Sequence, residues 1–284
     1  MQDVVRTGSG ECVDESRTLP ITAIVVTYNE DRRLNECLGG LSFCDQLIVT
    51  DLGSEDRSVD IAREHGAEII HHERLPVVEQ VRARVIDRAE YEWVLFIDPD
   101  EVFHQALIER VTHLLYDEND VGRVFFPWLF YFRGRPLYGT HWGGCKHKGV
   151  LIHRERCRLS EEVYRGIEVD EGYRTVHLDW TNREHHIRHY WMDSVLQLVE
   201  KHRRYSQQDA KSRFKRGKRF PGWLRWGRKM LGAFKSSYVD NNGWREGARG
   251  LFLSVFWALY QGVSLLALRR YQKNHAGEDS DGDE

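Results

Sequence analysis

Three carboxylates stand together at Asp98-Pro99-Asp100-Glu101, directly after the apolar run from Trp93 to Ile97. The run is rich in β-branched and aromatic residues, so it predicts a short strand buried on both faces. In an open α/β sheet, ligands bind at the carboxyl ends of the strands, which is where these carboxylates would lie. Carboxylates so close together repel one another, and a hard divalent cation with oxygen ligands relieves that repulsion. The segment therefore indicates either a Mg²⁺ or Mn²⁺ site shared with substrate phosphates, or a solvated acidic turn.

The elements that must position this segment alternate in type along the chain. Three further apolar runs predict strands, a buried one at residues 21–27 and two more at residues 46–50 and 68–70. Segments with helical features follow them, at residues 31–41, 56–62 and 78–90. Strands that alternate with helices at this spacing predict an α/β fold with a parallel, doubly wound sheet. The chain contains neither G-x-G-x-x-G nor G-x-x-x-x-G-K-[ST], which argues against a dinucleotide-binding or P-loop protein.

Three blocks of sequence resemble family 2 glycosyltransferases, whose fold is named GT-A. The blocks are Ile24-Val25-Val26-Thr27-Tyr28-Asn29-Glu30, Asp51-Leu52-Gly53-Ser54-Glu55-Asp56-Arg57-Ser58 and Asp98-Pro99-Asp100-Glu101. The rest of the chain resembles the branch typified by lipopolysaccharide-core glucosyltransferases, in which a His-Tyr block precedes an Arg-Tyr-Ser block. Here these are His189-Tyr190 and Arg204-Tyr205-Ser206. The resemblance implies a mostly parallel, Rossmann-like sheet flanked by helices, and a nucleoside-diphosphate sugar, with a UDP-sugar as first choice, as the donor.

The resemblance also implies which residues bind the nucleotide. Asp51 would accept a hydrogen bond from the uracil N3–H, and a carboxylate that faces an imide N–H makes a strong, charge-assisted bond. Ser54 would contact the nucleotide or, in a second interpretation, cap the following helix together with Asp56. Arg82 stands where family members often carry an Arg that reaches toward the nucleotide, although Ala83 replaces the Asn that commonly follows. The other residues implied for the nucleoside pocket are Thr27, Tyr28 and Glu30.

The acidic segment and one histidine would hold the metal. By resemblance, Asp98 would bind the ribose or a metal-bound water, and Asp100 would ligate the cation that bridges both phosphates. His189 would complete the ligands or donate to the pyrophosphate, and an imidazole suits Mn²⁺ more than Mg²⁺. His185 and His186 stand close by in the sequence, so a structural role for His189 stays open. The cation would neutralise charge on the departing nucleoside diphosphate.

Family 2 enzymes invert the anomeric centre, which requires one general base at the acceptor hydroxyl. The related branch carries a Val-His-Glu-like block there, and Val163-Tyr164-Arg165 stands in its place in this chain. Glu161 and Glu162 directly precede that block, so they are the predicted bases, with a plain surface charge as the alternative. The acceptor would lie against the aromatic residues between 125 and 153. Among these we single out Trp142 as a ring that could stack on a sugar.

The C-terminal third has the composition of a membrane-binding region. Between residues 211 and 229, nine Lys or Arg are interleaved with Phe and Trp, and no acid stands among them. This mixture suits an anionic membrane surface, and no nucleic-acid-binding fold accompanies it, so we expect no nucleic-acid partner. Residues 251–268 form an uncharged run that, as a helix, is near the lower limit for crossing a bilayer. We expect it to lie in or against the membrane, with a buried helix as the alternative.

Composition fits a folded chain with one large domain and an appendage. The 284 residues are 41% hydrophobic, and the five cysteines form no C-x-x-C pair, which favours reduced thiols in a cytoplasmic compartment. The net charge of −3 conceals a balance of +15 in residues 201–275, where 18 Lys or Arg face three acids. The expected organisation is a disordered leader (1–19), a GT-A catalytic domain (20–188), a helical membrane-associating region (189–272) and an acidic tail (273–284).

Together these features predict an inverting glycosyltransferase on the cytoplasmic face of a membrane. It would move a hexose, with glucose as first choice, from a UDP-sugar to a glycolipid or envelope-glycan acceptor, with help from Mn²⁺ or Mg²⁺. Two alternatives stay open. A nucleotidyltransferase would also pair an α/β fold with acidic metal ligands, and a catalytically degenerate adaptor would use only the basic membrane-binding region.

Overall fold

The chain divides into two compact units. A computed structural model describes residues 18–75, 77–159 and 166–275, so most of the predicted leader and tail lies outside the described residues. The first unit comprises Met1–Phe125 and Gly149–His177, and the second comprises Phe126–Lys148 and Leu178–Glu284. Strands β6 (Val121–Phe132) and β8 (Lys146–His153) run from one unit into the other.

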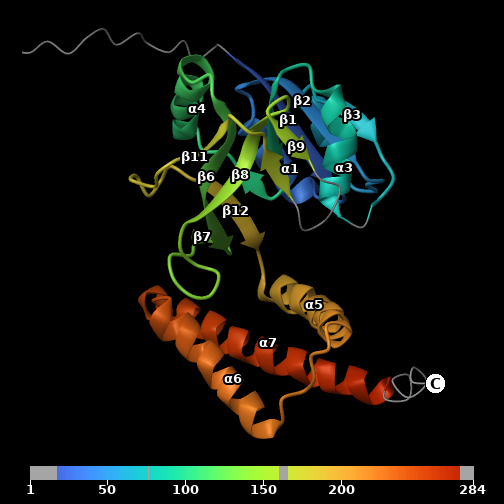
Figure 1. Ribbon diagram of the computed structural model, residues 1–284, viewed down its shortest axis with the longest axis vertical. Coiled ribbons are helices and arrows are strands. Elements are labelled where there is room, and N and C mark those ends of the chain that lie inside the picture. The colour runs from blue at the N-terminus through green and yellow to red at the C-terminus, as the bar shows by residue number, and fades with distance from the viewer. Residues whose placement is uncertain (1–17, 76, 160–165, 276–284) are drawn as a thin grey trace, which may run out of the picture. The chain divides into compact units, whose positions relative to one another are not determined.

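The sheet of the first unit is mostly parallel. Its parallel strands lie in the order β3 (Glu68–His71), β2 (Cys44–Asp51), β1 (Leu19–Thr27) and β4 (Trp93–Ile97). Antiparallel β8 follows β4, and then comes β6, to which β11 (Arg174–His177) adds in parallel. A separate hairpin pairs β9 (Cys157–Leu159) with β10 (Ile167–Val169). Figure 1 shows helices against this sheet, so the predicted α/β fold, with a mostly parallel sheet flanked by helices, is confirmed.

The first three helices of the first unit lie near the segments that the sequence pattern predicts. They are α1 (Asp31–Gly39), α2 (Ser58–Glu64) and α3 (Val78–Val85), which the 3-10 helix η1 (Ile86–Arg88) continues. The sequence pattern did not predict α4 (Ala106–Asp117), which follows the short strand β5 (Glu101–Val102). Val81 and Val85 of α3 pack on the sheet face that carries Ile24 of β1. Ala23 and Val25 point to the opposite face and are also fully buried. Burial on both faces explains why β1 is mostly apolar rather than alternating between apolar and polar residues.

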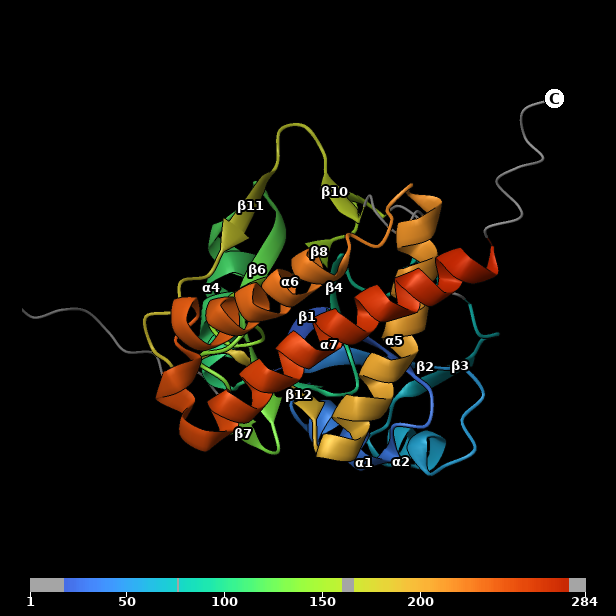
Figure 2. The same cartoon turned by 90° about the horizontal axis from the view of Figure 1, so that it is seen from below.

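The second unit joins the ends of β6 and β8 to a helical region. β12 (Ile187–Met192) pairs with β6 in parallel, and β7 (Arg135–Pro136) pairs with it antiparallel. The helices are α5 (Val195–Lys215), α6 (Trp223–Lys235), the π-helical η2 (Ser236–Asp240), the 3-10 helix η3 (Gly243–Glu246) and α7 (Gly247–Asn274). Both α5 and α6 pack against α7 (Figure 2). Gly222 precedes α6 with a φ of 89°, so the Pro221-Gly222 pair separates α5 from α6.

An aromatic core fills the second unit, and Trp142 belongs to it. Only 7% of Trp142 is exposed, and its ring centroid lies 4.8 Å from that of Trp191 and 5.4 Å from that of Trp257. His202 and Phe256 surround the same ring. The prediction that Trp142 stacks on a sugar is therefore wrong, because other rings already cover its faces.

The units do not divide between residues 188 and 189, where the sequence suggested a domain boundary. Residues 126–148 and 178–188 belong to the second unit. The cause is the length of β6, which has 12 residues. Its first half pairs with β11 in the first unit, and its second half pairs with β7 and β12 in the second.

Candidate active site

Three parallel strands end at the same edge of the sheet. Thr27 of β1 lies opposite Asp51 of β2, and Val25 lies opposite Ile97 of β4. The loops that follow these strands therefore gather at one edge, which is where α/β sheets bind ligands. The predicted nucleotide-binding residues in these loops are Tyr28, Glu30, Ser54 and Asp98.

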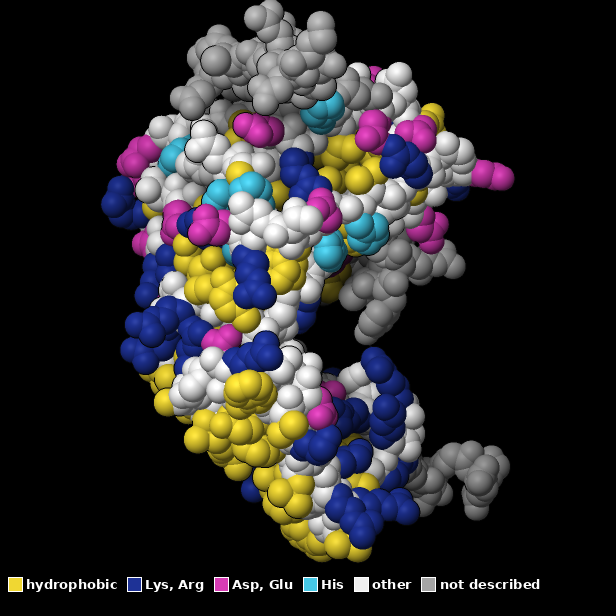
Figure 3. Space-filling view, turned by 90° about the vertical axis from the view of Figure 1, so that its left-hand side faces the viewer, with side chains coloured by type: hydrophobic (Ala, Val, Ile, Leu, Met, Phe, Trp, Pro, Cys, Tyr) yellow, Lys and Arg dark blue, Asp and Glu magenta, His cyan; other side chains and the backbone are white. Residues whose placement is uncertain are grey.

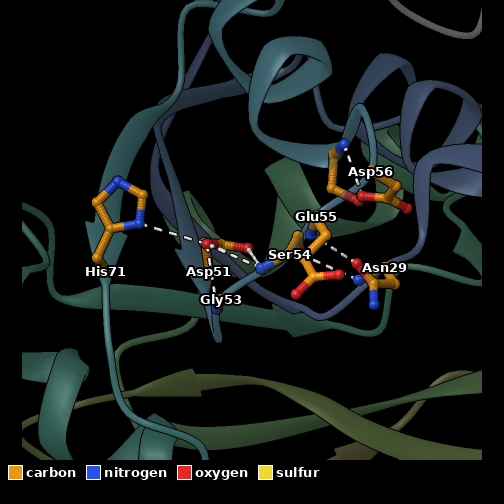
Figure 4. Close-up of polar contacts among 8 residues, drawn as sticks. Asn29, Asp51, Gly53, Ser54, Glu55, Asp56 and His71 are labelled. Carbon is orange, nitrogen blue, oxygen red and sulfur yellow. Dashed lines mark hydrogen bonds and ion pairs between the residues drawn. The ribbon is translucent and has the colours of Figure 1, made fainter.

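The Asp51 carboxylate is buried at this edge, with 2% of the residue exposed. It accepts hydrogen bonds from the backbone N–H of Gly53 at 3.2 Å and from that of Ser54 at 3.1 Å (Figure 4). The Nδ1 atom of His71, at the end of β3, lies 3.3 Å from the same carboxylate. These contacts fix its direction, and a carboxylate has enough lone pairs to accept a further N–H from a ligand. His71 is a site residue that sequence reasoning missed, since nothing in the local pattern places it beside Asp51.

Asn29 ties the loop after β1 to the loop after β2. Its side-chain oxygen accepts the N–H of Glu55 at 2.8 Å, and its own N–H donates to Ser54 Oγ at 2.9 Å (Figure 4). The next residue, Glu30, donates its N–H to Ser58 Oγ at 3.0 Å. The φ of Asn29 is 56°, in the left-handed region that Asn tolerates better than most residues. Asn29 thus positions both loops, although the sequence pattern pointed only to its neighbours.

Ser54 does not cap α2. The helix begins at Ser58, and Arg57 before it offers no side-chain cap. Asp56 accepts the N–H of Ser58 at 3.0 Å, so the capping interpretation applies to Asp56 alone. The hydroxyl of Ser54 instead accepts the N–H of Asn29. A direct contact between Ser54 and the nucleotide stays a prediction.

Tyr28 presents an exposed ring at this edge. The guanidinium carbon of Arg74 lies 4.1 Å from the ring centroid, a cation–π contact that holds the ring in place. Arg74 follows β3 and was not predicted as a site residue. Thr27 is buried at the end of β1, whereas Glu30 is exposed. The predicted contacts of these three residues with a nucleoside remain to be tested.

The three carboxylates of the acidic segment have different surroundings. Asp98 Oδ1 lies 2.6 Å from Arg82 Nη2, and the same guanidinium lies 5.3 Å from the centroid of the Phe96 ring. Glu101 is fully buried, and its carboxylate accepts the N–H of Asp98 at 3.1 Å. The protein itself therefore relieves much of the predicted repulsion. Asp98 and Asp100 are both partly exposed.

A divalent cation at this edge would be held by Asp100 together with the substrate. Within residues 18–75, 77–159 and 166–275, no group of three or more His, Cys, Asp or Glu could hold a metal ion. Mg²⁺ and Mn²⁺ still fit the donor set, because such ions commonly use one or two carboxylates and complete their ligands with substrate phosphates. Because the Asp98 carboxylate already pairs with Arg82, we expect Asp98 to bind the ribose rather than to be a direct metal ligand.

The other predicted residues lie elsewhere in the chain. His189 is in β12 of the second unit, where its ring centroid lies 4.7 Å from that of Trp128 and 4.8 Å from that of Phe130. The acidic segment belongs to the first unit. Glu161 and Glu162 lie outside the described residues. The roles of His189 as a metal ligand and of the two glutamates as bases stay predictions.

Comparisons with known proteins agree with this fold. Residues 22–161 match the family model described as glycosyl transferase family 2. An uncharacterised glycosyltransferase of Rickettsia typhi is 23% identical over 254 residues, which cover 88% of this chain and 86% of the relative. The lipopolysaccharide core biosynthesis glycosyltransferase LpsC of Rhizobium meliloti is 26% identical over 265 residues, which cover 90% of this chain and 93% of LpsC.

A solved structure also matches part of the chain. It is that of glucosyl-3-phosphoglycerate synthase from Mycobacterium tuberculosis in complex with Mn²⁺ and UDP-glucose. The match covers 42% of this chain and 44% of that chain, at 22% identity and a TM-score of 0.33.

Fold, sheet edge and sequence relatives together define the class of the protein, which is a glycosyltransferase. Its domain at residues 22–161 belongs to glycosyltransferase family 2, and a lipopolysaccharide-core enzyme is among its relatives, as the sequence blocks predict.

Proposed function

We propose that the protein transfers a hexose from a UDP-sugar to a glycan or lipid-linked acceptor, with inversion of the anomeric centre and with help from Mn²⁺ or Mg²⁺. The observation that carries this proposal is the buried Asp51 carboxylate, which backbone N–H groups hold at the same sheet edge as Asp98 and Asp100. Uracil presents an imide N–H to such an acceptor, and the resulting bond is charge-assisted. Cytosine and adenine present a bare ring nitrogen at the equivalent position, so Asp51 favours a base with a ring N–H, and the family resemblance makes uracil the first choice.

The rest of the donor would bind along the same edge. The exposed ring of Tyr28 offers an apolar face to the base. Asp98, oriented by Arg82, would accept hydrogen bonds from the ribose hydroxyls. Asp100 would hold the cation with the two phosphates. When bound, the cation supplies charge neutralisation for the departing nucleoside diphosphate.

Inversion of the anomeric centre also requires a general base from the chain. An acceptor hydroxyl would attack the anomeric carbon opposite the leaving group, and a general base would remove its proton. Glu161 and Glu162 are the proposed bases. Glucose as the transferred hexose follows from the family resemblance, and an envelope glycan as the acceptor is supported by the relative LpsC, a lipopolysaccharide core biosynthesis glycosyltransferase.

Exposed apolar side chains on the helical region support attachment to a membrane. No residue of α6 is buried, and its Leu224 and Leu231 are 71% and 72% exposed. On α7 the exposed apolar residues include Leu251, Val255, Leu259 and Val263, which recur at every fourth position and so share one side of the helix. Figure 3 shows hydrophobic side chains gathered over this region with Lys and Arg beside them.

We propose that these helices lie on the membrane rather than cross it. Among the described residues, one helical stretch, Gly243–Asn274, is long and apolar enough to span a bilayer, with a mean hydropathy of 1.8 over its most apolar window. However, 39% of its most apolar window is buried inside the protein, because α5 and α6 pack against α7. Only the outer side of α7 would meet lipid, and the basic residues of 211–229 would meet anionic headgroups at about 1 kcal/mol each. This arrangement suits a peripheral enzyme of the cytoplasmic face without a nucleic-acid partner.

Calorimetric titration of the full chain with UDP-glucose, UDP and CDP, each with and without Mn²⁺, tests the proposal. We expect UDP-glucose to bind more tightly with Mn²⁺, and CDP to bind at least about tenfold more weakly than UDP, because a buried acceptor without its donor is costly. Asp100→Ala should remove the effect of Mn²⁺. The control is Glu90→Gln, an exposed acid before the amino end of β4, which should behave as wild type.

Two outcomes would contradict the proposed donor site. One is equal affinity for UDP and CDP, and the other is an undiminished Mn²⁺ effect in Asp100→Ala. Release of pyrophosphate rather than UDP in a turnover assay would instead indicate a nucleotidyltransferase.

A further inference from the structure

The segment between α5 and α6 meets the C-terminal part of α7 (Figure 2). Gln272 of α7 accepts the backbone N–H of Phe220 at 3.1 Å, which fixes this segment against the helix. Three residues earlier on α7, the guanidinium carbon of Arg269 lies 4.6 Å from the ring centroid of Trp223 and 5.5 Å from that of Phe220. The two ring centroids are 5.4 Å apart. Phe220, Trp223, Leu224 and Arg269 are called the Arg269 corner below, and all four belong to the second unit.

The guanidinium of Arg269 is partly exposed and forms no ion pair with any other described residue. Residues 201–275 contain three acids, and each of them already pairs with a neighbouring cation. These pairs are Asp209 with Arg213, Asp240 with Lys235 and Glu246 with Arg249. A guanidinium held over an aromatic ring can still donate from its edge, where its N–H groups form a planar fork that matches a phosphate. Arg269 therefore offers this fork to a ligand.

The same corner exposes apolar side chains to water. Trp223 is 56% exposed and Leu224 is 71% exposed. Trp226, one turn further along α6, instead donates its Nε1–H to a backbone oxygen of α7 at 3.0 Å, so α6 is attached to α7 by a different side. Lys273 is exposed and follows Arg269 by four positions, which places it on the same side of α7. Exposed Trp and Leu beside cations are typical of a surface that meets both the headgroups and the acyl chains of a bilayer.

We propose that the Arg269 corner binds the phosphate of an anionic phospholipid. The fork of Arg269 would contact the phosphate oxygens, and Trp223 and Leu224 would contact the glycerol and the first acyl carbons. A zwitterionic headgroup carries its own cation, which competes with Arg269 for the phosphate, so the corner should select anionic lipid. Nucleic acid also offers phosphates, but it offers no aliphatic partner to Leu224. The inference rests on the proposed attachment to a membrane and adds the class of lipid that the surface recognises.

Vesicle flotation of the full chain, without nucleotide sugar or metal, tests the inference. The vesicles contain phosphatidylcholine alone or phosphatidylcholine mixed with phosphatidylglycerol. We expect the mixed vesicles to bind the chain at least about tenfold more tightly, because several cations act together near acidic lipid. Glycerol 3-phosphate and a thymidine oligonucleotide serve as competitors. Neither should displace the chain from the vesicles, since both lack the acyl chains that Trp223 and Leu224 would contact.

Variants then connect lipid binding to the corner. Arg225→Gln is the matched control, because Arg225 is an exposed arginine of α6 that contacts no ring among the described residues. It should weaken binding to the mixed vesicles by about fivefold, which is the general share of one cation near acidic lipid. Arg269→Gln should weaken binding by at least about twentyfold, because it also removes the fork of donors. Arg269→Lys keeps the charge without the fork and should bind about threefold more weakly than wild type.

The inference is overturned if both kinds of vesicle bind equally, if Arg269→Gln loses no more affinity than Arg225→Gln, or if Arg269→Lys binds like wild type. Displacement by glycerol 3-phosphate would assign the corner to a soluble phosphate ester, and displacement by the oligonucleotide would assign it to nucleic acid, so either result also overturns it. Urea unfolding of each variant identifies misfolding, and Arg269→Lys decides the matter if Arg269→Gln is unstable.

Failure of this inference is distinguishable from failure of the proposed function. The flotation assay contains no donor, so UDP-glucose binding can persist when the lipid assignment is wrong, and the reverse also holds. Vesicle binding that does not depend on Arg269 would leave membrane attachment in place and remove only the phosphate site.

Discussion

Removing the positive charge of Arg82 should destabilise the first unit through Asp98. The two side chains form an ion pair at 2.6 Å, with 13% of the Arg82 side chain and 33% of the Asp98 side chain exposed. Arg82→Gln keeps much of the side-chain volume and removes the cation. Asp98 then stays at the sheet edge without its counter-charge, close in sequence to Asp100 and Glu101.

The exposure of the pair sets the expected size of the effect. Breaking a fully buried ion pair costs about 3–5 kcal/mol, whereas an exposed pair contributes about 0–1 kcal/mol. Arg82 is close to the buried limit and Asp98 lies between the limits, so we expect Arg82→Gln to lower the free energy of unfolding by about 2 kcal/mol. Asp98→Asn should cost less, because the guanidinium keeps its contact with the Phe96 ring.

A double-mutant cycle measures the interaction itself. Urea unfolding of Arg82→Gln, Asp98→Asn and the double variant should give a coupling energy of about 1–2 kcal/mol. The matched control is the pair Arg57–Glu64, at 3.3 Å with side chains 69% and 60% exposed, whose cycle should give less than about 0.5 kcal/mol. A coupling for Arg82 and Asp98 no larger than that of the control would refute the view that Arg82 relieves charge repulsion at this edge.

Three further predictions concern stability. Asn29→Ala should be less stable than Asn29→Gly by about 1 kcal/mol in urea unfolding, because only glycine adopts a φ of 56° without steric cost; equal stabilities would contradict this. Gly250→Ala should lower the free energy of unfolding by more than about 2 kcal/mol, because the added Cβ would lie 1.9 Å from the backbone oxygen of Gly243. Gly232→Ala has open space around the added Cβ, so it should raise the free energy of unfolding by up to about 1 kcal/mol through the better helix propensity of Ala. Thermal unfolding of both variants tests this, and a similar change in both would contradict it. Burial lowers the pKa of His202, so the unfolded chain binds the proton first as pH falls below the ordinary His value of about 6.5, and the free energy of unfolding decreases toward lower pH. His202→Phe should reduce the difference in the free energy of unfolding between pH 7 and pH 5, as measured by urea unfolding. An unchanged difference would contradict this prediction.

The family resemblance gave different roles to Asp98 and Asp100 and none to Glu101, but only the fold shows the surroundings of these three carboxylates. Glu101 turns inward to accept a backbone N–H, Asp98 pairs with a helix residue 16 positions earlier, and Asp100 stays partly exposed. The same limit applies to Trp142, whose surrounding rings come from β12, α5 and α7. A composition rich in aromatic residues indicates that rings will cluster, but it does not say which of them face a ligand.

The sequence alone determined the first strands and helices of the first unit and the ends of the strands on which the candidate donor site stands. Apolar runs and helical periodicity are properties of neighbouring residues, so β1, β2, β4, α1 and α7 can be read from short windows. The tertiary structure decided which side chains meet: Asn29 with Glu55, His71 with Asp51, and Lys146 with Phe130. These partners stand 16 to 26 residues apart in the chain, and packing of whole elements brings them together, which no local pattern records.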